Sequence, residues 1–373
     1  MKILVTGAKG FVGKNLIAEL RNQGFNDIYE YDIDTVPELL DDYTKDCSFV
    51  FHLAGVNRPK DTAEFMHGNF GFTNLLLNSL SKHKNNAPIL VSSSIQAELN
   101  NPYGESKKAG EELIFEYGKT NNIPVYVYRL PNVFGKWCKP NYNSAVATFC
   151  NNITNELPIQ INDPKVGMKL VYIDDVVALF IEKLKNGTTN NQPYESVSPV
   201  HEIELGAIVE LLNGFKQSRE NLQIPDMSDA FTKKLYSTYL SYLPEDKFSY
   251  FLKTNIDNRG SFTEFLKTKE RGQVSINISK PGITKGNHWH HTKNEKFLVV
   301  SGKGVIRFRK IDSTEIIEYQ VSGDKLEVVD IPVGYTHNIE NLGESDMVTV
   351  MWVNEIYDNE KPDTFFLDVA PNP

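Results

Sequence analysis

The stretch KILVTGAKGFVG, residues 2–13, joins a short apolar run to three glycines spaced three residues apart. The apolar run predicts a buried strand, and apolar residues at helical spacing over residues 11–23 predict a helix directly after it. Glycines at such a junction permit a tight turn and let a pyrophosphate approach the backbone at the helix N-terminus. The stretch therefore predicts the first strand and helix of a parallel sheet that binds a dinucleotide.

The segments that follow repeat this alternation. Strand-like runs occupy residues 27–34, 47–55, 87–94 and 123–130, and NPYGESKKAGEELIFEYGK, residues 101–119, is typical of a long helix. Strands that alternate with helices indicate a parallel sheet covered on both faces. We therefore expect an α/β doubly wound sheet of the Rossmann type.

A different pattern begins after about residue 245. Short strand-like runs follow one another closely, as in QVSINIS (residues 273–279), and Gly, Asp and Asn separate them. Closely spaced strands without intervening helices are typical of an all-β barrel or sandwich. We place the division near Leu243, which gives a first domain of residues 1–243 and a second domain of residues 244–373.

The composition is that of a globular protein with an acidic balance. The 373 residues include 39 Lys and Arg against 48 Asp and Glu, a formal net charge of −9. Such a charge argues against nucleic acid or an anionic membrane as the main partner. No run approaches the roughly 18 apolar residues of a membrane span, and no signal peptide precedes the first strand, so we expect a cytoplasmic protein.

Tyr103 and Lys107 stand four residues apart in the predicted long helix, so both side chains face one way. An ammonium beside a phenol favours its ionised form and would make Tyr103 a proton donor near neutral pH. TGAKGFVG and YGESK together resemble the extended short-chain dehydrogenase/reductase family. The resemblance implies Ser94 as the third catalytic residue, bonding a substrate carbonyl, with Ser92 and Ser93 as alternatives in the same run.

The same resemblance implies where a nicotinamide cofactor binds. HLAG is similar to the family's loop on the adenine side, and RLPNVFG is similar to its element beside the nicotinamide. The expected cofactor-binding residues are Gly7, Lys9, Gly10, Phe11, Val12, Gly13, Asp32, Leu53, Ala54, Gly55, Tyr103, Lys107, Pro131 and Asn132. A carboxylate such as Asp32 bonds the ribose 2′-hydroxyl of NADH, whereas an ammonium such as Lys9 pairs with the 2′-phosphate of NADPH. The residues leave both cofactors open.

Ser94 is followed by Ile95 and Gln96. Nucleotide-sugar dehydratases of the same family carry an Asp-Glu pair there, which performs the elimination. We therefore expect reduction rather than dehydration.

Histidines gather in GNHWHHTKNEKF, residues 286–297, near the C-terminal end. Two spaced motifs account for them, G-(x)5-H-x-H-(x)4-E-(x)6-G and P-x-G-x-x-H-x-x-x-N. Their chemically active members are His288, His290, Glu295 and His337. The motifs resemble those of the cupin family, which implies an all-β cupin barrel for the last third of the chain.

These side chains suit a metal. His288 and His290 alternate along a strand and share one face, while His291 and Trp289 are out of phase with them. Three imidazoles and a carboxylate suit a divalent transition metal with room for water or substrate. The set leaves Zn²⁺, Fe²⁺, Mn²⁺ and Ni²⁺ open, of which we expect Zn²⁺. A metal-free cupin with hydrogen-bonded histidines is the alternative.

A reductase joined to a metal cupin resembles a family of bifunctional nucleotide-sugar enzymes of bacterial capsular polysaccharide synthesis. The resemblance implies a UDP-linked 2-acetamido-2,6-dideoxy-hexos-4-ulose as substrate, a C3 epimerisation in the cupin domain, and then C4 reduction with NADPH. The product would be UDP-N-acetyl-6-deoxytalosamine, on the route to UDP-N-acetylfucosamine. The resemblance also implies a homodimer through the cupin domain.

Two alternatives stay open for the second domain. In the first, the chain is a plain NAD(P)H-dependent nucleotide-sugar reductase whose cupin domain is only a structural or dimerisation module. In the second, the chain is an Fe²⁺ cupin oxygenase fused to an unrelated dehydrogenase, and it would consume O₂.

Overall fold

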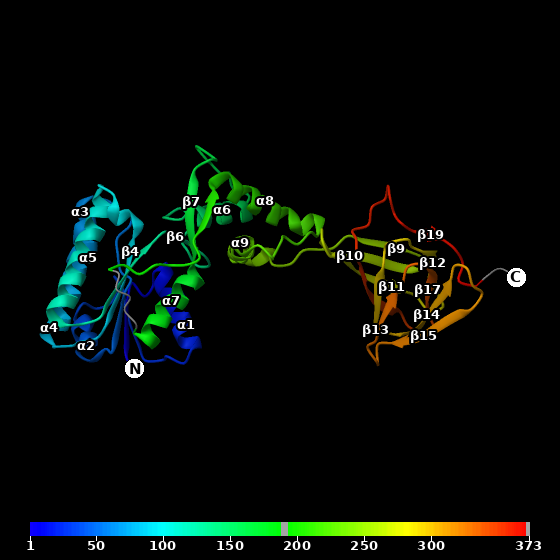
Figure 1. Cartoon of the computed structure of the whole chain (residues 1–373), viewed down its shortest axis with the longest axis horizontal. Helices are drawn as coiled ribbons and strands as arrows, with labels where there is room; N and C mark the ends of the chain where they lie inside the picture. The colour runs from blue at the N-terminus through cyan, green and yellow to red at the C-terminus, as the bar shows by residue number, and fades with distance from the viewer. Residues whose placement is uncertain (188–192, 371–373) are drawn as a thin grey trace. The chain divides into compact units, whose positions relative to one another are not determined.

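The computed structural model describes residues 1–187 and 193–370 (Figure 1). The chain forms two compact units, one of Met1–Asn213 with Ser228–Pro244, and one of Gly214–Met227 with Glu245–Pro373. The chain thus enters the second unit twice, where the sequence analysis placed a single division near Leu243. One helix runs without a break across the first crossing, so no local pattern marks it.

The first unit is built on five parallel strands in the order β2-β1-β3-β4-β5. Their bounds are β1 (Ile3–Thr6), β2 (Ile28–Tyr31), β3 (Phe49–His52), β4 (Ile89–Ser94) and β5 (Val125–Leu130). The chain leaves β1 for β2 on one side and then returns to β3 on the other. Ligands bind outside the carboxyl ends of the strands at such a switch point.

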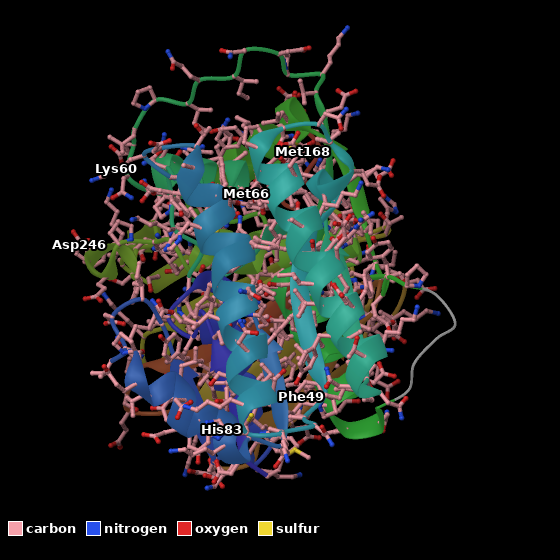
Figure 2. All side chains as sticks on the ribbon, turned by 90° about the vertical axis from the view of Figure 1, so that its left-hand side faces the viewer. Phe49, Lys60, Met66, His83, Met168 and Asp246 are labelled. Carbon is pink, nitrogen blue, oxygen red and sulfur yellow. The ribbon has the colours of Figure 1, made fainter. Side chains whose placement is uncertain are left out.

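Helices cover both faces of this sheet (Figure 1). The main ones are α1 (Phe11–Asn22), α2 (Glu38–Asp46), α4 (Phe72–Lys82), α5 (Pro102–Asn121) and α7 (Ile173–Asn186). Ile3 and Val5 pack with α1 and α7, while Leu4 between them packs with α2, α4 and α5. Figure 2 shows α4 and α5 side by side over their face. Both faces are therefore apolar, as a buried parallel sheet requires.

Further elements complete the first unit. They are α3 (Ala63–Phe65), η1 (Met66–Gly71), η2 (Ile95–Glu98), α6 (Ala145–Thr154), α8 (Leu205–Asn221), α9 (Ala230–Leu240) and a three-stranded sheet of β6 (Asn132–Phe134), β7 (Gly167–Tyr172) and β8 (His201–Glu204). Of these, α8 continues into the second unit. No described helix of either unit has the length and apolar composition needed to cross a bilayer.

The second unit consists of two antiparallel sheets (Figure 1). One has the order β16 (Val328–Ile331), β13 (Glu295–Ser301), β18 (Met347–Val353), β11 (Gly272–Ser279), β10 (Gly260–Thr268) and β9 (Thr254–Asp257). The other has the order β15 (Ile316–Ser322), β14 (Lys303–Lys310), β17 (Tyr335–Asn341), β12 (Thr284–Trp289) and β19 (Phe365–Phe366). A short 3₁₀ turn, η3 (Glu245–Lys247), precedes them. The predicted fold class, a Rossmann-type sheet followed by an all-β domain, is confirmed.

The interior of the second unit has an apolar and a polar part. Phe297 and Val299 of β13 pack with Ile306 and Phe308 of β14 in one buried cluster. The buried side chains of β11 are polar instead, namely those of Gln273, Ser275, Asn277 and Ser279. Buried polar groups are costly unless they are hydrogen-bonded. The row of buried polar side chains on β11 therefore indicates that this strand lines a binding site for a polar ligand rather than an apolar core.

Candidate functional site

The glycine loop forms a tight cradle at the start of α1. Gly7 has a φ of +69°, and a Cβ on it would lie 2.7 Å from the backbone nitrogen of Ala54. A Cβ on Gly13 would lie 2.2 Å from the Gly7 carbonyl oxygen, which accepts a 3.0 Å hydrogen bond from Gly10. These positions therefore exclude a side chain. The loop lies against Leu53 and Ala54, so the structure brings together two expected parts of the cofactor site.

Phe11 and Val12 begin α1, and their partly buried side chains pack against the hydrophobic core between α1 and the sheet. Their predicted role in cofactor binding therefore rests on their place at the helix N-terminus, where backbone N–H groups favour an anion.

Carboxylates gather beyond the end of β2. The backbone N–H of Lys9 donates to Asp32 at 2.7 Å, and the Lys9 ammonium forms an exposed ion pair with Asp34. The hydrogen bond to Asp34 raises the pKa of Lys9. Lys9 thus already has an anionic partner, and the acids suit a ribose hydroxyl better than a 2′-phosphate. Asp34 was missed in the sequence, although it stands two residues from Asp32.

The three predicted catalytic residues lie together between β4 and α5. Ser94 lies close enough to Tyr103 to lower the pKa of its phenol. Lys107 Nζ donates to the Ser92 carbonyl at 2.9 Å, and a Cβ on Gly55 would lie 3.5 Å from the same nitrogen. Lys107 therefore lies beside both the C-terminal end of β4 and the expected cofactor loop.

Burial dominates the titration of these groups. It raises the pKa of Tyr103, and the nearby Ser94 side chain offsets this only in part. Burial lowers the pKa of Lys107 to about 8, although the charge of Glu111 opposes this. The sequence analysis expected the ammonium to favour the tyrosinate. In this structure the desolvation of Tyr103 is the larger effect, because Lys107 donates to a backbone carbonyl instead.

A buried network supports this face of α5 and was not predicted. The Glu111 carboxylate, one helical turn beyond Lys107, accepts a hydrogen bond from Ser93 and a 2.6 Å bond from Arg129. Its side chain is 1% exposed. Ser93 is therefore engaged with Glu111, which supports Ser94 over Ser93 as the catalytic serine. The spacing of Tyr103, Lys107 and Glu111 at every fourth residue was the signal that could have revealed it.

Pro131 and Asn132 follow directly after Leu130, which pairs with Ser94 across β4 and β5. Asn132 begins β6 and its side chain is exposed. Their contact with a nicotinamide stays a prediction.

His52 is structural. Its nitrogens lie 2.8 and 2.9 Å from the hydroxyls of Thr6 and Thr73, and burial lowers its pKa to about 3.

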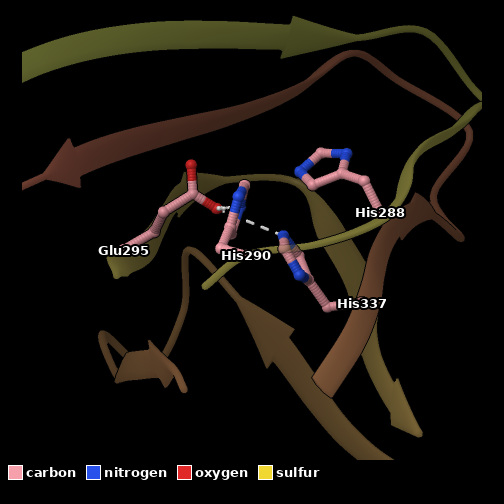
Figure 3. Close-up of side chains that lie close together, drawn as sticks. All are labelled: His288, His290, Glu295 and His337. Atoms are coloured by element: carbon pink, nitrogen blue, oxygen red, sulfur yellow. Dashed lines mark ion pairs between the residues drawn. The ribbon is translucent and has the colours of Figure 1, made fainter. Parts of the chain in front are cut away.

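The four expected metal ligands form one cluster in the second unit. His288, His290, Glu295 and His337 each offer a ligand atom, and these atoms all lie within 4.8 Å of one another. Figure 3 shows the Glu295 carboxylate directed toward the imidazoles of His290 and His337, with His288 on the far side of them. The β-sheet register opposes His288 on β12 to His337 on β17. Residues 49 positions apart therefore meet because their strands pair.

The cluster fits a cation. His290 Nε2 and His337 Nε2 lie 3.4 and 3.1 Å from Glu295 Oε2, yet these buried atoms have no partner in hydrogen-bond geometry. Burial lowers the pKa of His288 to about 4, so its imidazole is neutral at neutral pH. Burial acts to raise the pKa of Glu295, but His290 and His337 hold it well below its usual range. Neutral imidazoles and an ionised carboxylate are the forms that bind metals.

Asp363 orients the cluster from outside and was also missed. Its carbonyl oxygen lies 2.6 Å from His290 Nδ1, which directs Nε2 toward the other ligands. Its carboxylate accepts bonds of 3.0, 2.9 and 2.8 Å from the backbone N–H groups of His291, Thr292 and Lys293. Partners of this kind fix the ring and tautomer of a ligating histidine.

His291 and Trp289 lie outside the cluster, as their strand phase predicted. Their rings contact each other and that of Phe365, with centroids 4.6 to 5.1 Å apart.

Two cavities meet at His288. They have volumes of about 450 and 510 Å³ and share Asn255, Phe262 and Met351 in their lining. The polar wall of β11 contributes Asn277 to the first cavity and Gln273 and Ser275 to the second. The cluster is therefore accessible to a polar ligand.

A dinucleotide cradle with a Ser-Tyr-Lys set and a histidine–glutamate cluster thus stand on one chain. Residues 3–195 match the family model described as NAD dependent epimerase/dehydratase family. The chain belongs to this family, which implies a nicotinamide cofactor. Residues 255–365 match the model described as polysaccharide biosynthesis C-terminal domain.

Similar proteins extend over the whole chain. The crystal structure of capsular polysaccharide assembling protein CapF from Staphylococcus aureus is 57% identical, with a TM-score of 0.94 over 99% of this chain and 100% of that chain. CapF with the inhibitor 3-isopropenyl-tropolone has a TM-score of 0.89 over the same shares at 53% identity. A UDP-2-acetamido-2,6-beta-L-arabino-hexul-4-ose reductase of Pseudomonas aeruginosa is 46% identical over 374 residues, 99% of each chain. The resemblance predicted from the sequence is confirmed.

Proposed function

We propose that the first unit reduces the C4 ketone of a UDP-linked 2-acetamido-2,6-dideoxy-hexos-4-ulose. The glycine cradle at Gly7, Gly10 and Gly13 would hold NADPH, which would supply the hydride. Ser94 would bond the C4 oxygen, Tyr103 would give it a proton, and the Lys107 ammonium would hold the cofactor and support proton transfer. The product is the C4 alcohol, a UDP-N-acetyl-6-deoxytalosamine. The name of the P. aeruginosa relative supports this substrate class.

Reduction, not elimination, fits the residues beside the Ser-Tyr-Lys set. Ile95 and Gln96 follow Ser94 at the start of η2, so the Asp-Glu pair of dehydratases is missing from these positions. NADPH is our expected cofactor on the family resemblance, whereas Asp32 and Asp34 favour NADH. The ratio of kcat/KM for the two cofactors measures the preference directly.

The second unit is proposed to invert C3 before reduction takes place. A ketone at C4 acidifies the C3 proton, so a base can remove it and a proton can return to the opposite face. Reduction abolishes this acidity, and the epimerisation must therefore come first. His288, His290, Glu295 and His337 would hold a divalent ion, with Zn²⁺ expected, that supplies positive charge near the substrate oxygen.

The single observation that carries this proposal is the cluster itself. Buried atoms of the cluster lack hydrogen-bond partners, namely His290 Nε2, both ring nitrogens of His337 and Glu295 Oε2. The cluster also adjoins two cavities. The tropolone inhibitor of CapF agrees with a metal, because the adjacent oxygens of a tropolone chelate divalent cations.

Proton NMR in D₂O tests both steps. With the ketosugar and enzyme but no NADPH, deuterium should enter C3. The His288→Ala variant should lose this exchange. Tyr103→Phe should keep it while its C4 reduction falls by about 10²- to 10⁴-fold.

Absence of C3 exchange in the wild type, with normal reduction once NADPH is added, would refute the epimerase step. The alternative, a plain reductase whose second unit is a structural or dimerisation module, would then stand. We also expect a cytoplasmic homodimer without nucleic acid or membrane partners, and analytical ultracentrifugation measures its oligomeric state.

A further inference from the structure

The two cavities that meet at the metal-ligand cluster differ in charge. The first contains Arg259 and Lys285 with one acid, Asp257. The charged lining of the second is Glu264, Lys293, Glu295 and Glu355. Excess positive charge thus lies on one side of the cluster and excess negative charge on the other. An elongated ligand with one anionic end has a preferred orientation in such a site.

Lys285 is a half-buried cation with neutral partners. Its Nζ donates to Asn277 Oδ1 at 2.8 Å and to the Ile278 carbonyl oxygen at 2.9 Å. Among the residues that the structure describes, no carboxylate lies within ion-pair distance of this nitrogen. Burial lowers the pKa of Lys285, which reflects the cost of leaving the ammonium without an anion. A bound anion would remove that cost.

Arg259 lies at the turn between β9 and β10 and lines the same cavity. Its guanidinium bonds Asp257 Oδ2 at 3.0 and 2.7 Å, but both side chains are about half exposed, 56% and 45%. Exposed ion pairs of this kind contribute little free energy, so the arginine can exchange its partner at small cost. Planar guanidinium groups also match phosphate oxygens in geometry.

We propose that Arg259 and Lys285 bind the diphosphate of the nucleotide sugar and so place its sugar ring at His288 and His337. The inference rests on the proposed epimerase function and adds the substrate's orientation. The diphosphate occupies the cavity with Arg259 and Lys285, and the sugar reaches the cluster. The acidic second cavity repels the phosphates and takes uncharged sugar substituents, for which Ser275 and Gln273 offer hydrogen bonds.

The first test separates binding from chemistry. C3 solvent exchange is measured in D₂O for Arg259→Gln and Lys285→Gln in the full chain. Each variant should raise the KM for the ketosugar by about tenfold or more, since each removes a charge-assisted hydrogen bond, while kcat changes little. Lys310→Gln is the matched control, because Lys310 pairs with Asp312 at 3.5 Å and lines neither cavity. A KM equal to that of the control in both variants overturns the inference.

The second test does not depend on turnover. Isothermal titration of the full-length protein with UDP should reveal a second site in addition to that of the reductase, and both variants should lose it. Inorganic phosphate should compete poorly with UDP for this site if the site binds a diphosphate. If inorganic phosphate binds there as well as UDP does, the site recognises a simple phosphate and the assignment is overturned. A single UDP site in the wild type also overturns it. If exchange is absent in the wild type but the variant-sensitive UDP site is present, the epimerase proposal fails while the diphosphate site stands.

Discussion

Lys107 retains its positive charge over a limited pH range. Its pKa of about 8 reflects burial first, opposed by Glu111. The ammonium is present below this pH and is lost above it, so we expect kcat/KM for NADPH-dependent reduction to fall as pH rises through about 8 to 9. Steady-state rates between about pH 6 and 10 test this. Lys107→Met should give a low and level profile, and a wild-type profile that stays level to about pH 9 contradicts the prediction.

Asp363 acts on the metal-ligand cluster through His290. Asp363→Ala removes the carboxylate that holds the backbone N–H groups of residues 291–293, so the carbonyl that orients His290 loses its fixed position. We expect metal affinity to fall by about 10- to 100-fold. Competition with a chromogenic chelator measures this affinity.

Asp358→Ala is the control for Asp363→Ala. Asp358 accepts a backbone N–H bond from Glu360 in the same C-terminal segment but touches no ligand. Equal metal affinity in the two variants would show that Asp363 does not position His290.

At the scale of elements, two hydrogen bonds attach α5 to successive residues of β4. The Ser92 carbonyl accepts from Lys107, and the Ser93 hydroxyl donates to Glu111. The helix therefore cannot slide along the strand without breaking both bonds. This attachment keeps Lys107, and Tyr103 one turn before it, at a fixed height above the sheet.

Glu111→Gln tests the electrostatic part of this attachment. Removing the carboxylate takes away the charge that raises the pKa of Lys107, so the alkaline fall in reduction should move to lower pH. It also leaves Arg129 without its buried partner, which costs about 3–5 kcal/mol of folding free energy. The pH profile and the thermal midpoint are the two measurements.

Glu98→Gln is the matched control for Glu111→Gln. Glu98 also binds Arg129, at 3.0 Å, but its side chain is 71% exposed, so we expect a small effect on stability and an unchanged profile. Ser93→Ala keeps the carboxylate and should likewise leave the alkaline limb in place. An unshifted limb in a folded Glu111→Gln variant would contradict the electrostatic role.

Sequence reasoning succeeded where a local pattern carries the information. The glycine spacing predicts the cradle because a strand, turn and helix are contiguous, and strand alternation predicts that His288 and His290 share a face. It failed where distant residues meet. Asp363 reaches His290 from 73 positions away, and no spacing predicts that contact. The short strand β6 was not predicted, because its partner β7 begins only at Gly167.

At the scale of the whole molecule, two chemical sites belong to one polypeptide. Under the proposed two-step reaction, linking them would raise the effective concentration of a labile ketosugar at its second site. We expect a mixture of Tyr103→Phe and His288→Ala proteins to regain product formation, with a lag and with accumulation of C3-epimerised ketosugar. NMR time courses at several protein concentrations measure this. Dilution should lower the specific activity of the mixture more than that of the wild type. If the two specific activities fall equally on dilution, joining the two sites in one chain has no kinetic role.

The double crossing between the units has a practical consequence for dissecting the protein. A fragment beginning at Glu245 would lack residues 222–224, whose backbone bonds Lys267 at 2.8 and 2.9 Å. A fragment ending at Asn213 would lack α9 and the Tyr242 hydroxyl that bonds the Cys138 carbonyl at 2.5 Å. A fragment of residues 1–244 keeps the whole first unit and one of residues 214–373 keeps the whole second unit, but the two fragments overlap over residues 214–244. A single proteolytic cut therefore cannot release both units complete, and each unit has to be expressed from its own overlapping fragment.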